Sequence, residues 1–283
     1  MRILIIGSNG LLGSDLVEDW KGDVVIPATS RDADIRDLPQ VRQLVARYHP
    51  DWVILAAGFT DVDASEGDPD TAFAVNRDGA KNVSIAAREA GAKLCYLSTD
   101  YVFDGASDRP YEPEDPIHPL NIYGASKAAG EQAVQDQAGH WLIIRTSWLF
   151  GATRPGFPEN ILLTADTQPE LKVVADQRGS PTYTRDLATA IRDLVRADAH
   201  GILNVTNSGT CSWFEFAIET LHRAGRSTPI LPITSAEAGR LARRPAYSAL
   251  SSKVLASRGI VMRGWQEALV AYLSELHMKG KLH

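Results

Sequence analysis

The stretch that decides the fold is Arg2-Ile3-Leu4-Ile5-Ile6-Gly7-Ser8-Asn9-Gly10-Leu11-Leu12-Gly13, close to the N-terminus. An apolar run typical of a buried strand leads into three glycines spaced three residues apart, and a helical pattern follows. We expect Gly7 to permit a sharp turn, Gly10 to let a pyrophosphate approach the backbone, and Gly13 to let the helix pack on the sheet. The helix N-terminus then faces the phosphates of a dinucleotide. Two residues separate Gly7 from Gly10, so the stretch is a variant of the G-x-G-x-x-G fingerprint.

Further apolar runs occur at residues 23–26, 52–55, 94–97 and 141–144, and they alternate with helical-looking stretches. Strands that are apolar on both faces belong to parallel sheets covered by helices on both sides. The sequence therefore predicts an α/β fold with a Rossmann-type doubly wound parallel sheet. We expect one long crossover helix over residues 70–90, with Asp70 as its N-cap and Gly91 at its end.

This strand and helix rhythm weakens after Arg145, and residues 151–158 are rich in glycine and proline. We expect residues 1–150 to form a dinucleotide-binding Rossmann domain that carries the catalytic residues. Residues 151–283 are expected to form mainly a smaller C-terminal substrate-binding lobe, with some segments returning to the Rossmann domain. Residues 264–276 have the pattern of an amphipathic closing helix.

The composition excludes several classes of protein. The 283 residues carry a net charge of -6, which does not favour a nucleic-acid partner. Cys95 and Cys211 are the only cysteines, so we predict no disulfide framework and a reducing compartment. From residues 1–7 we expect no signal-type leader, and no apolar stretch approaches the ~20 residues that span a bilayer. We expect a cytoplasmic protein with no membrane partner.

The end of the second strand normally contacts the adenosine ribose, where an acid favours NAD and an arginine accommodates the extra phosphate of NADP. The chain reads Ala28-Thr29-Ser30-Arg31 at this place and has no acid there. The sequence therefore favours NADPH, with Arg31 beside its additional phosphate, and leaves NADH open. Asp34 lies just beyond and is an alternative contact to adenine.

A tyrosine and a lysine four residues apart, Tyr123 and Lys127, indicate the chemistry. At this spacing the two side chains share one face of a helix. Hydride addition to a ketone leaves an alkoxide that needs a proton. A tyrosine with a reference pKa of about 10 gives up its proton more readily beside a cation, so we expect Lys127 to lower the pKa of Tyr123. Of the eight tyrosines, only Tyr123 has a lysine four residues later, so the predicted pair has no competitor.

Two more polar residues fit a site around this pair. Thr99 ends a predicted strand, where ligands of doubly wound sheets bind, and its hydroxyl can hold the reacting carbonyl. The alternative is a hydroxyl that caps a turn. Asn76 lies inside the predicted crossover helix, where asparagine is unfavourable without a partner. We expect that partner to be a backbone group or a water linked to Lys127, and an exposed surface position is the alternative.

Six further segments accompany the glycine stretch. They are LAAGFTDVD at 55–63, STDYVFDG at 98–105, NIYGASK at 121–127, RTSW at 145–148, DQRGSPT at 176–182 and ARRP at 242–245. Together they resemble the dTDP-4-dehydrorhamnose reductase family, in the sugar-nucleotide reductase branch of the extended short-chain dehydrogenases/reductases. The resemblance covers nearly the whole chain. It implies reduction of the 4-keto group of dTDP-4-dehydro-6-deoxy-L-mannose to dTDP-L-rhamnose, for cell-surface polysaccharide.

The resemblance also implies site residues. The catalytic set is Thr99, Tyr123 and Lys127, and Lys127 also holds the nicotinamide ribose. An arginine fork suits a diphosphate, and an indole face suits the apolar side of a deoxysugar. The implied substrate contacts are Asp100, Val102 and Trp148 at the sugar, Thr99 at the reacting carbonyl, and Arg178 or Arg244 near the nucleotide diphosphate. Besides the glycines, Arg31, Asp34 and Lys127, the implied cofactor contacts are Asn9, Leu11, Leu12, Ser30, Ile35, Ala56, Ala57, Gly58, Thr60, Asn76 and Tyr123.

The chain departs from the family at Gly156, because relatives often have an asparagine before the aromatic residue that is Phe157 here. The substrate contact of that asparagine is therefore not carried over to this chain. Some relatives resemble magnesium-linked dimers held by acids of the first helix. Asp15 and Glu18 lie at that place in this chain, but such acids are common on helix surfaces, and we predict no metal. A homodimer stays open.

Three other functions also stay open. A sugar-nucleotide dehydratase shares the fold, but elimination commonly uses a second carboxylate after the threonine, and Tyr101 follows Asp100 here. An epimerase differs chiefly in retaining its cofactor through a reversible oxidation. A non-catalytic NADP-binding regulatory subunit, resembling that of methionine adenosyltransferase, does not need the Tyr123 and Lys127 pair that this chain keeps.

Overall fold

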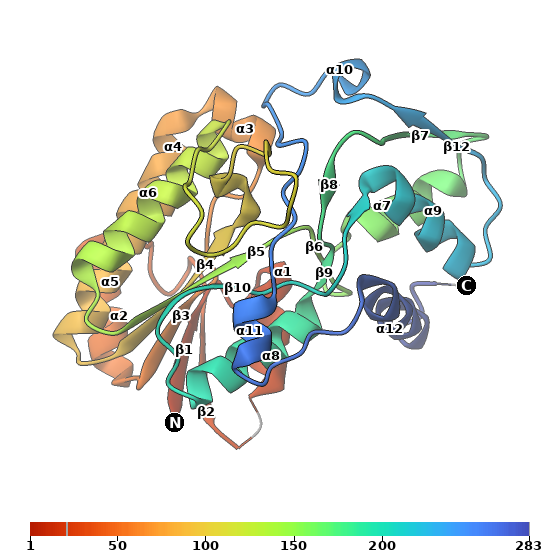
Figure 1. The fold of residues 1–283 in the computed structure, drawn as a ribbon. Helices are drawn as coiled ribbons and strands as arrows, with labels where there is room; N and C mark the ends of the chain where they lie inside the picture. Colours follow the sequence, from red (N-terminus) through yellow and green to blue (C-terminus); the bar gives the residue numbers. More distant parts are fainter. Residues whose placement is uncertain (21, 283) are drawn as a thin grey trace.

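A six-stranded parallel sheet forms the centre of the larger lobe (Figure 1). The computed structural model describes residues 1–20 and 22–282. The strand order is β2-β1-β3-β4-β5-β10, with bounds Val24–Ala28, Arg2–Ile6, Trp52–Leu55, Lys93–Thr99, Trp141–Thr146 and Gly201–Asn204. The predicted doubly wound sheet is confirmed. Because β2 and β3 lie on opposite sides of β1, the order reverses there, and ligands of such sheets bind at the carboxyl ends of the strands beside this point.

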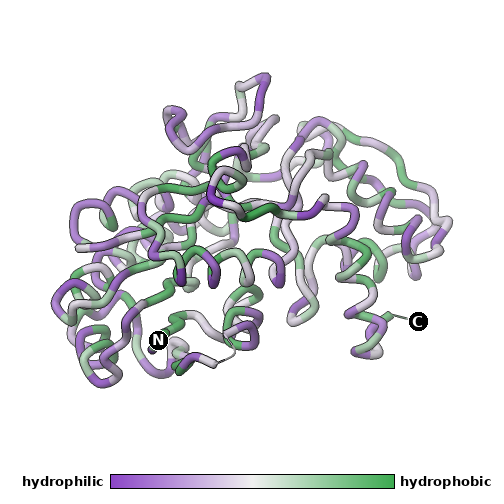
Figure 2. The backbone as a smooth tube through the Cα atoms, turned by 60° about the horizontal axis from the view of Figure 1, so that its bottom comes forward, coloured by the Kyte–Doolittle hydropathy of each residue, from purple (hydrophilic) through white to green (hydrophobic). Residues whose placement is uncertain are grey.

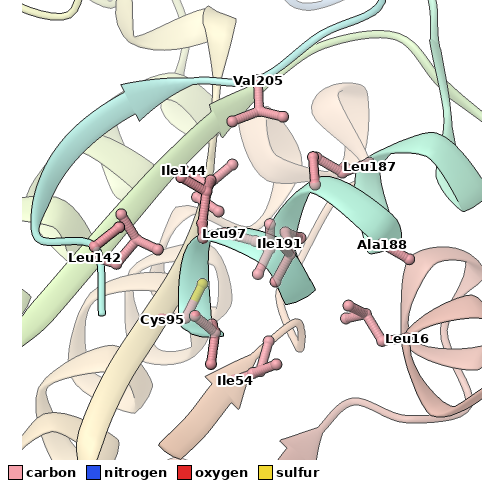
Figure 3. Close-up of a cluster of buried hydrophobic side chains, with 14 of the residues drawn as sticks. Leu16, Ile54, Cys95, Leu97, Leu142, Ile144, Leu187, Ala188, Ile191 and Val205 are labelled. Carbon is pink, nitrogen blue, oxygen red and sulfur yellow. The ribbon is translucent and has the colours of Figure 1, made fainter. Parts of the chain in front are cut away.

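Helices cover both faces of the sheet. Ile3 and Ile5 of β1 belong to one core and Leu4 and Ile6 to the other, as the period of two along a strand requires. The first core, shown in Figure 3, is covered by α1 (Leu11–Asp19), α8 (Thr184–Arg196) and α11 (Lys253–Ser257). The second is covered by α2 (Leu38–Tyr48), α5 (Ala80–Glu89) and α6 (Ile122–Gln137).

The crossover helix expected over residues 70–90 is divided into three helical segments. After α3 (Val62–Gly67) come α4 (Pro69–Phe73), the π-helix η1 (Ala74–Gly79) and α5. Asp68, and not Asp70, caps α4, because its side chain accepts a hydrogen bond from the Thr71 amide at 3.0 Å. Gly91 follows the end of α5 with a φ of 70°, as the sequence predicted.

The second half of the chain builds a smaller lobe around a core of its own, on the right of Figure 1. Phe150, Phe216 and Tyr272 are fully buried in this core. The helices of the lobe are α7 (Phe157–Ala165), α9 (Trp213–Arg223), α10 (Ser235–Ala238) and α12 (Trp265–Met278). Its strand pairs are β7 (Leu171–Val174) with β12 (Ile230–Ile233), β6 (Leu149–Phe150) with β9 (Thr182–Tyr183), and β8 (Arg178–Gly179) with β11 (Cys211–Ser212). In contrast, α8, β10 and α11 come from this half of the chain but belong to the layers of the large sheet.

Hydrophobic residues are concentrated in the interior strands, and hydrophilic residues are concentrated in the outer turns (Figure 2). Cys95 and Cys211 are buried free thiols in separate cores. Over residues 1–20 and 22–282, no helix has the length and apolar character that a membrane span needs.

Candidate functional site

The glycine stretch forms the turn between β1 and α1, beside the point where the strand order reverses. Gly7 has a φ of 90°, and a Cβ added to it would lie 2.5 Å from the Ala57 amide nitrogen. A Cβ on Gly13 would lie 2.0 Å from the carbonyl oxygen of Gly7. Only glycine fits at these two positions, because the turn, the end of β3 and the start of α1 are in direct backbone contact.

The N-terminus of α1 is open at this turn. Gly10 is the N-cap and has no side-chain cap. The hydrogen bond from Ser14 N to Gly10 O, at 3.1 Å, is the first of the helix, so the amides of Leu11 and Leu12 have no partner within it. Free amides at the positive end of a helix dipole, with no side chain in front of Gly10, fit a diphosphate group. Asn9 is exposed beside them.

The turn after β2 carries the residues expected at the adenosine end. Ser30 and Arg31 are exposed there. The Asp34 carboxylate forms a bidentate ion pair with Arg36, at 2.6 and 3.0 Å, and remains partly exposed. Ile35 is buried, and its side chain fills the space beside Gly79.

The segment after β3 runs along the same crevice. Ala56 N and Ala57 N both donate to Ile6 O, at 2.9 and 3.0 Å, which joins this segment to the end of β1. Gly58 and Thr60 are exposed. A Cβ on Gly58 would lie 4.0 Å from Lys127 Nζ, so this segment borders the expected catalytic lysine.

Asn76 holds that segment in place from the π-helix. Its side chain accepts from Phe59 N and donates to Phe59 O and Ser126 Oγ, each at 2.9 Å. The residue is only 2% exposed, which excludes the alternative of a surface position. The expected backbone partner is therefore found, and Ser126 links it to the helix turn that carries Lys127.

Thr99, Tyr123 and Lys127 lie where the end of β4 packs against α6, with Lys127 Nζ on Leu97 O of β4. Close helix contact places them there: a Cβ on Gly124 would lie 2.1 Å from Tyr101 O, and one on Gly130 would lie 2.3 Å from Asn76 O. Thr99 shares a hydrogen bond with Tyr123 and donates to Asp100 Oδ1 at 3.0 Å. It also accepts from Tyr101 N at 3.2 Å, so the turn-capping alternative holds together with the expected position at the site.

The electrostatics of this set differ from the expectation that Lys127 lowers the pKa of Tyr123. Burial raises the pKa of Tyr123 to about 12, although the hydrogen bond with Thr99 opposes the shift. Burial also lowers the pKa of Lys127 to about 7. Lys127 Nζ donates to Leu97 O at 2.5 Å and lies 4.0 Å from the ring centre of Tyr96, and its charge does not shift the pKa of Tyr123. Tyr123 accordingly keeps its proton at neutral pH, as a proton donor must.

A buried ion pair that the sequence analysis missed lies behind Lys127. Arg145 Nη2 and Glu131 Oε2 are 2.7 Å apart, and both side chains are almost fully buried. Ser98 Oγ donates to the same carboxylate at 2.5 Å. The charge of Glu131 raises the pKa of Lys127 against the effect of burial. Glu131 stands four residues after Lys127, a helical spacing that was the available sequence signal.

Two of the residues expected to contact the sugar, Asp100 and Val102, are buried. The Asp100 carboxyl is buried beside Thr99 and Ser248, its Oδ2 has no hydrogen-bond partner, and burial raises its pKa to about 7. Val102 is fully buried among Phe103, Tyr111 and Leu250. The Val102 side chain therefore packs in a small core, because the short helix after β4 turns it inward, and it differs from the expected sugar contact.

Trp148 has both faces of its indole covered. Trp213, which the sequence analysis missed, stacks on one face at a centroid distance of 3.6 Å and an angle of 7°. A Cβ on Gly179 would lie 2.5 to 2.7 Å from three contiguous indole atoms, and since Trp213 fills one face, Gly179 lies on the other. Stacking of an indole face of Trp148 on a deoxysugar, as expected from the sequence, would require Trp213 or Gly179 to move. Its φ of 47° lies in the left-handed region, which is rare for a non-glycine residue.

The two candidate arginines lie in different settings. Arg244 forms a bidentate ion pair with Asp63, at 2.6 and 2.8 Å, which lowers the pKa of that carboxyl to about 2. It lines a cleft of about 850 Å³ between the lobes, together with Tyr101, Phe157, Gln177, Trp213 and Arg240. Arg178 pairs with Glu215 at 3.2 Å and does not line this cleft. Of the two, Arg244 has the better position for a nucleotide diphosphate.

The sheet, the open glycine turn and the polar set at the end of β4 define a Rossmann-fold oxidoreductase of the short-chain dehydrogenase/reductase class. The family model described as the RmlD substrate binding domain matches residues 1–278. The chain belongs to the dTDP-4-dehydrorhamnose reductase family, which confirms the resemblance found in its sequence.

Individual relatives match over almost their full length. The spore coat polysaccharide biosynthesis protein SpsK of Bacillus subtilis is 42% identical to this chain, and the match covers 97% of each protein. The dTDP-4-dehydrorhamnose reductase of Sinorhizobium fredii is 36% identical, with 99% of each chain covered. The crystal structure of dTDP-4-dehydrorhamnose reductase from Bacillus anthracis, in complex with NADP, superposes with a TM-score of 0.95 at 39% identity, covering 97% of this chain and 99% of that one.

Proposed function

We propose that this protein reduces the 4-keto group of dTDP-4-dehydro-6-deoxy-L-mannose to give dTDP-L-rhamnose, with NADPH as the reductant. The observation that carries the proposal is that Thr99 lies beside Tyr123, with Lys127 bonded to Leu97 O, at the end of β4 in a chain of the dTDP-4-dehydrorhamnose reductase family. A solved relative of 39% identity binds NADP, which supports the cofactor. The exposed Arg31 after β2, with no acid at the strand end, favours NADPH over NADH.

Each residue of the set has a task in this reaction. NADPH supplies the hydride to carbon four when it is bound. Tyr123 donates its phenolic proton to the oxygen of that carbon, and the Thr99 hydroxyl holds the same oxygen. Lys127 holds the nicotinamide ribose. Asn76 fixes the segment after β3 that forms the side of the cofactor crevice.

The smaller lobe supplies the substrate pocket in this proposal. The cleft between the lobes has Arg244 for the diphosphate and the aromatic side chains Tyr101, Phe157 and Trp213 for the base and sugar. Asp100 and the edge of Trp148 complete the sugar contacts. The cofactor-binding part then consists of residues 1–150 without the strand β6 at their end, together with α8, β10 and α11.

The activity is tested by mixing the purified protein with NADPH and a dTDP-4-keto-6-deoxy-L-sugar. We expect NADPH oxidation only when the sugar is present, with dTDP-L-rhamnose as the product by NMR. The same assay with the GDP-linked sugar and with the D-sugar tests the nucleotide and the stereochemistry. A dehydrated sugar from a dTDP-hexose, or an epimer formed without net consumption of NADPH, would contradict the proposal. Cofactor binding without turnover would identify a regulatory subunit.

The proton donor is tested by Tyr123→Phe, which removes one hydroxyl and keeps the ring. Loss of a general acid should lower kcat by about 100-fold or more, while the Kd for NADPH stays close to that of the wild type. Tyr48→Phe, on α2, is the matched control and should keep full activity. Unchanged turnover in Tyr123→Phe would refute this role of the phenol.

A further inference from the structure

A loop from the second half of the chain lies against the glycine turn. Residues 151–154 follow β6, and Arg154 Nη2 donates to the carbonyl oxygen of Asn9 at 2.7 Å. Thr153 Oγ1 donates to Leu11 O at 3.2 Å. On its other side the loop is held by Lys281, whose Nζ donates to Ala152 O at 2.9 Å. The loop is thus fixed between the N-terminus of α1 and the C-terminal segment.

This contact brings a positive charge to the open end of α1. Arg154 is exposed, and among the described residues its side chain has no carboxylate partner, since its one hydrogen bond goes to Asn9 O. A guanidinium has five N–H donors, so most of them remain free in this position. Asn9 stands immediately before the N-cap Gly10, whose helix presents the unpaired amides of Leu11 and Leu12.

We infer that Arg154 is a cofactor-binding residue, which the fixed 151–154 loop holds in contact with the diphosphate of the nicotinamide dinucleotide. The inference rests on the cofactor named in the proposed function. Two backbone amides and a helix dipole neutralise only part of the charge of a diphosphate, and an arginine fork supplies both charge and paired donors. The contact of Thr153 with Leu11 holds the loop at the end of the helix where the diphosphate binds.

The position of Arg154 also separates its role from that of Arg31. Arg31 lies in the turn after β2, where the additional phosphate of NADPH is expected. Arg154 is bonded to the glycine turn, which faces the diphosphate that NADH and NADPH share. A change at Arg154 should therefore affect the two cofactors by the same factor, whereas a change at Arg31 should affect mainly NADPH.

The test is a titration of the full-length protein with NADPH and, separately, with NADH, followed by fluorescence, for wild type, Arg154→Ala and Arg154→Lys. Loss of a charge-assisted contact in Arg154→Ala should raise both Kd values by about tenfold. Arg154→Lys keeps the charge but lacks the paired donors of the guanidinium. Its Kd values should therefore lie between those of the wild type and of Arg154→Ala, and they should depend more steeply on the salt concentration. In steady-state assays the KM for NADPH should rise while kcat stays within about twofold of the wild type, since no reacting atom is touched.

Arg223→Ala on α9 is the matched control, because it removes one exposed arginine whose ion pair is with Glu219. Its Kd values should equal those of the wild type. Unchanged binding in Arg154→Ala, a loss confined to NADPH, or an equal loss in Arg223→Ala would each overturn the inference. The titration needs no sugar, so its result is independent of the activity assay. If the wild type binds neither dinucleotide, the cofactor in the proposed function is the part that fails.

Discussion

Asp100 is the residue whose burial has the clearest consequence in solution. Its carboxyl is 2% exposed and one oxygen has no hydrogen-bond donor, so the neutral form is favoured and the pKa rises from 3.8 to about 7. The folded protein therefore binds this proton more tightly than the unfolded chain does. The contribution of protonated Asp100 to the free energy of unfolding is therefore fully present below a pH of about 4 and is lost as the pH rises through about 7.

Asp100→Asn should remove this pH dependence, because an amide has a similar shape and does not ionise. We expect the Tm of the variant to match that of the wild type at a pH of about 4 and to exceed it at a pH of about 8. Thermal unfolding followed by circular dichroism over this range is the measurement. Asp63→Asn serves as the opposite case: Arg244 holds the pKa of Asp63 at about 2, so this variant should be less stable than the wild type at neutral pH. A constant difference in Tm between Asp100→Asn and wild type at every pH would refute the expectation.

The π-helix η1 is the element that joins the fold to the site. One widened helical turn between α4 and α5 carries Asn76, and such turns often occur at functional sites. Asn76→Ala would leave the backbone groups of Phe59 without their partner, so we expect a loss of about 2 kcal/mol of stability and a higher KM for NADPH. Asn160→Ala, at an exposed position of α7, is the control for urea unfolding and for kinetics. A change of stability without any change in KM would limit Asn76 to a structural role.

The start of α9 positions Trp148 in a similar way. Trp213 is the first residue of α9, which a capping box of Ser212 and Glu215 fixes. Removing the stacked ring in Trp213→Ala should free Trp148 and lower kcat/KM for the sugar by about tenfold, with no change in the Kd for NADPH. Trp213→Phe keeps part of the stack and should recover much of this loss. An equal loss of cofactor affinity in Trp213→Ala would indicate general unfolding instead.

The elements that could be predicted from the sequence are those with local signals. β1, the glycine turn and α1 follow from one continuous pattern, and the Tyr123 and Lys127 pair follows from helical spacing. Asn76 was singled out because asparagine is unfavourable inside a helix, although the π-turn that carries it has no such signal. Arg154 was missed because its partner Asn9 lies 145 residues away. The shifted pKa of Tyr123 was missed because burial and the direction of Lys127 depend on tertiary packing, which spacing does not reveal.

At the scale of the whole molecule, one cluster of charges joins the sheet layer to the smaller lobe. Arg185 of α8 contacts Glu275 of α12 at 2.7 Å and Glu18 of α1 at 3.1 Å, and lies 3.9 Å from Asp15. Asp15 and Glu275 are almost completely buried, and burial raises the pKa of Asp15. Three helices from distant parts of the chain therefore meet at one guanidinium, which balances carboxylates that the packing has removed from water.

Arg185→Met should test this dependence, because it keeps the aliphatic bulk, removes the cation beside Asp15, and leaves Glu275 with Lys279 as its one cationic partner among the described residues, at 2.8 Å. We expect a loss of about 2 kcal/mol in urea unfolding at neutral pH, discounted for the partial exposure of Arg185. Arg192→Met is the matched control on the same helix, since Arg192 pairs with Asp19 and not with α12, and it should cost less. Adding Glu275→Gln to Arg185→Met should restore part of the loss, because one of the two buried carboxylates is then replaced by a neutral amide. If the two single variants lose the same stability, and the second substitution restores none of it, the cluster does not hold the lobes together.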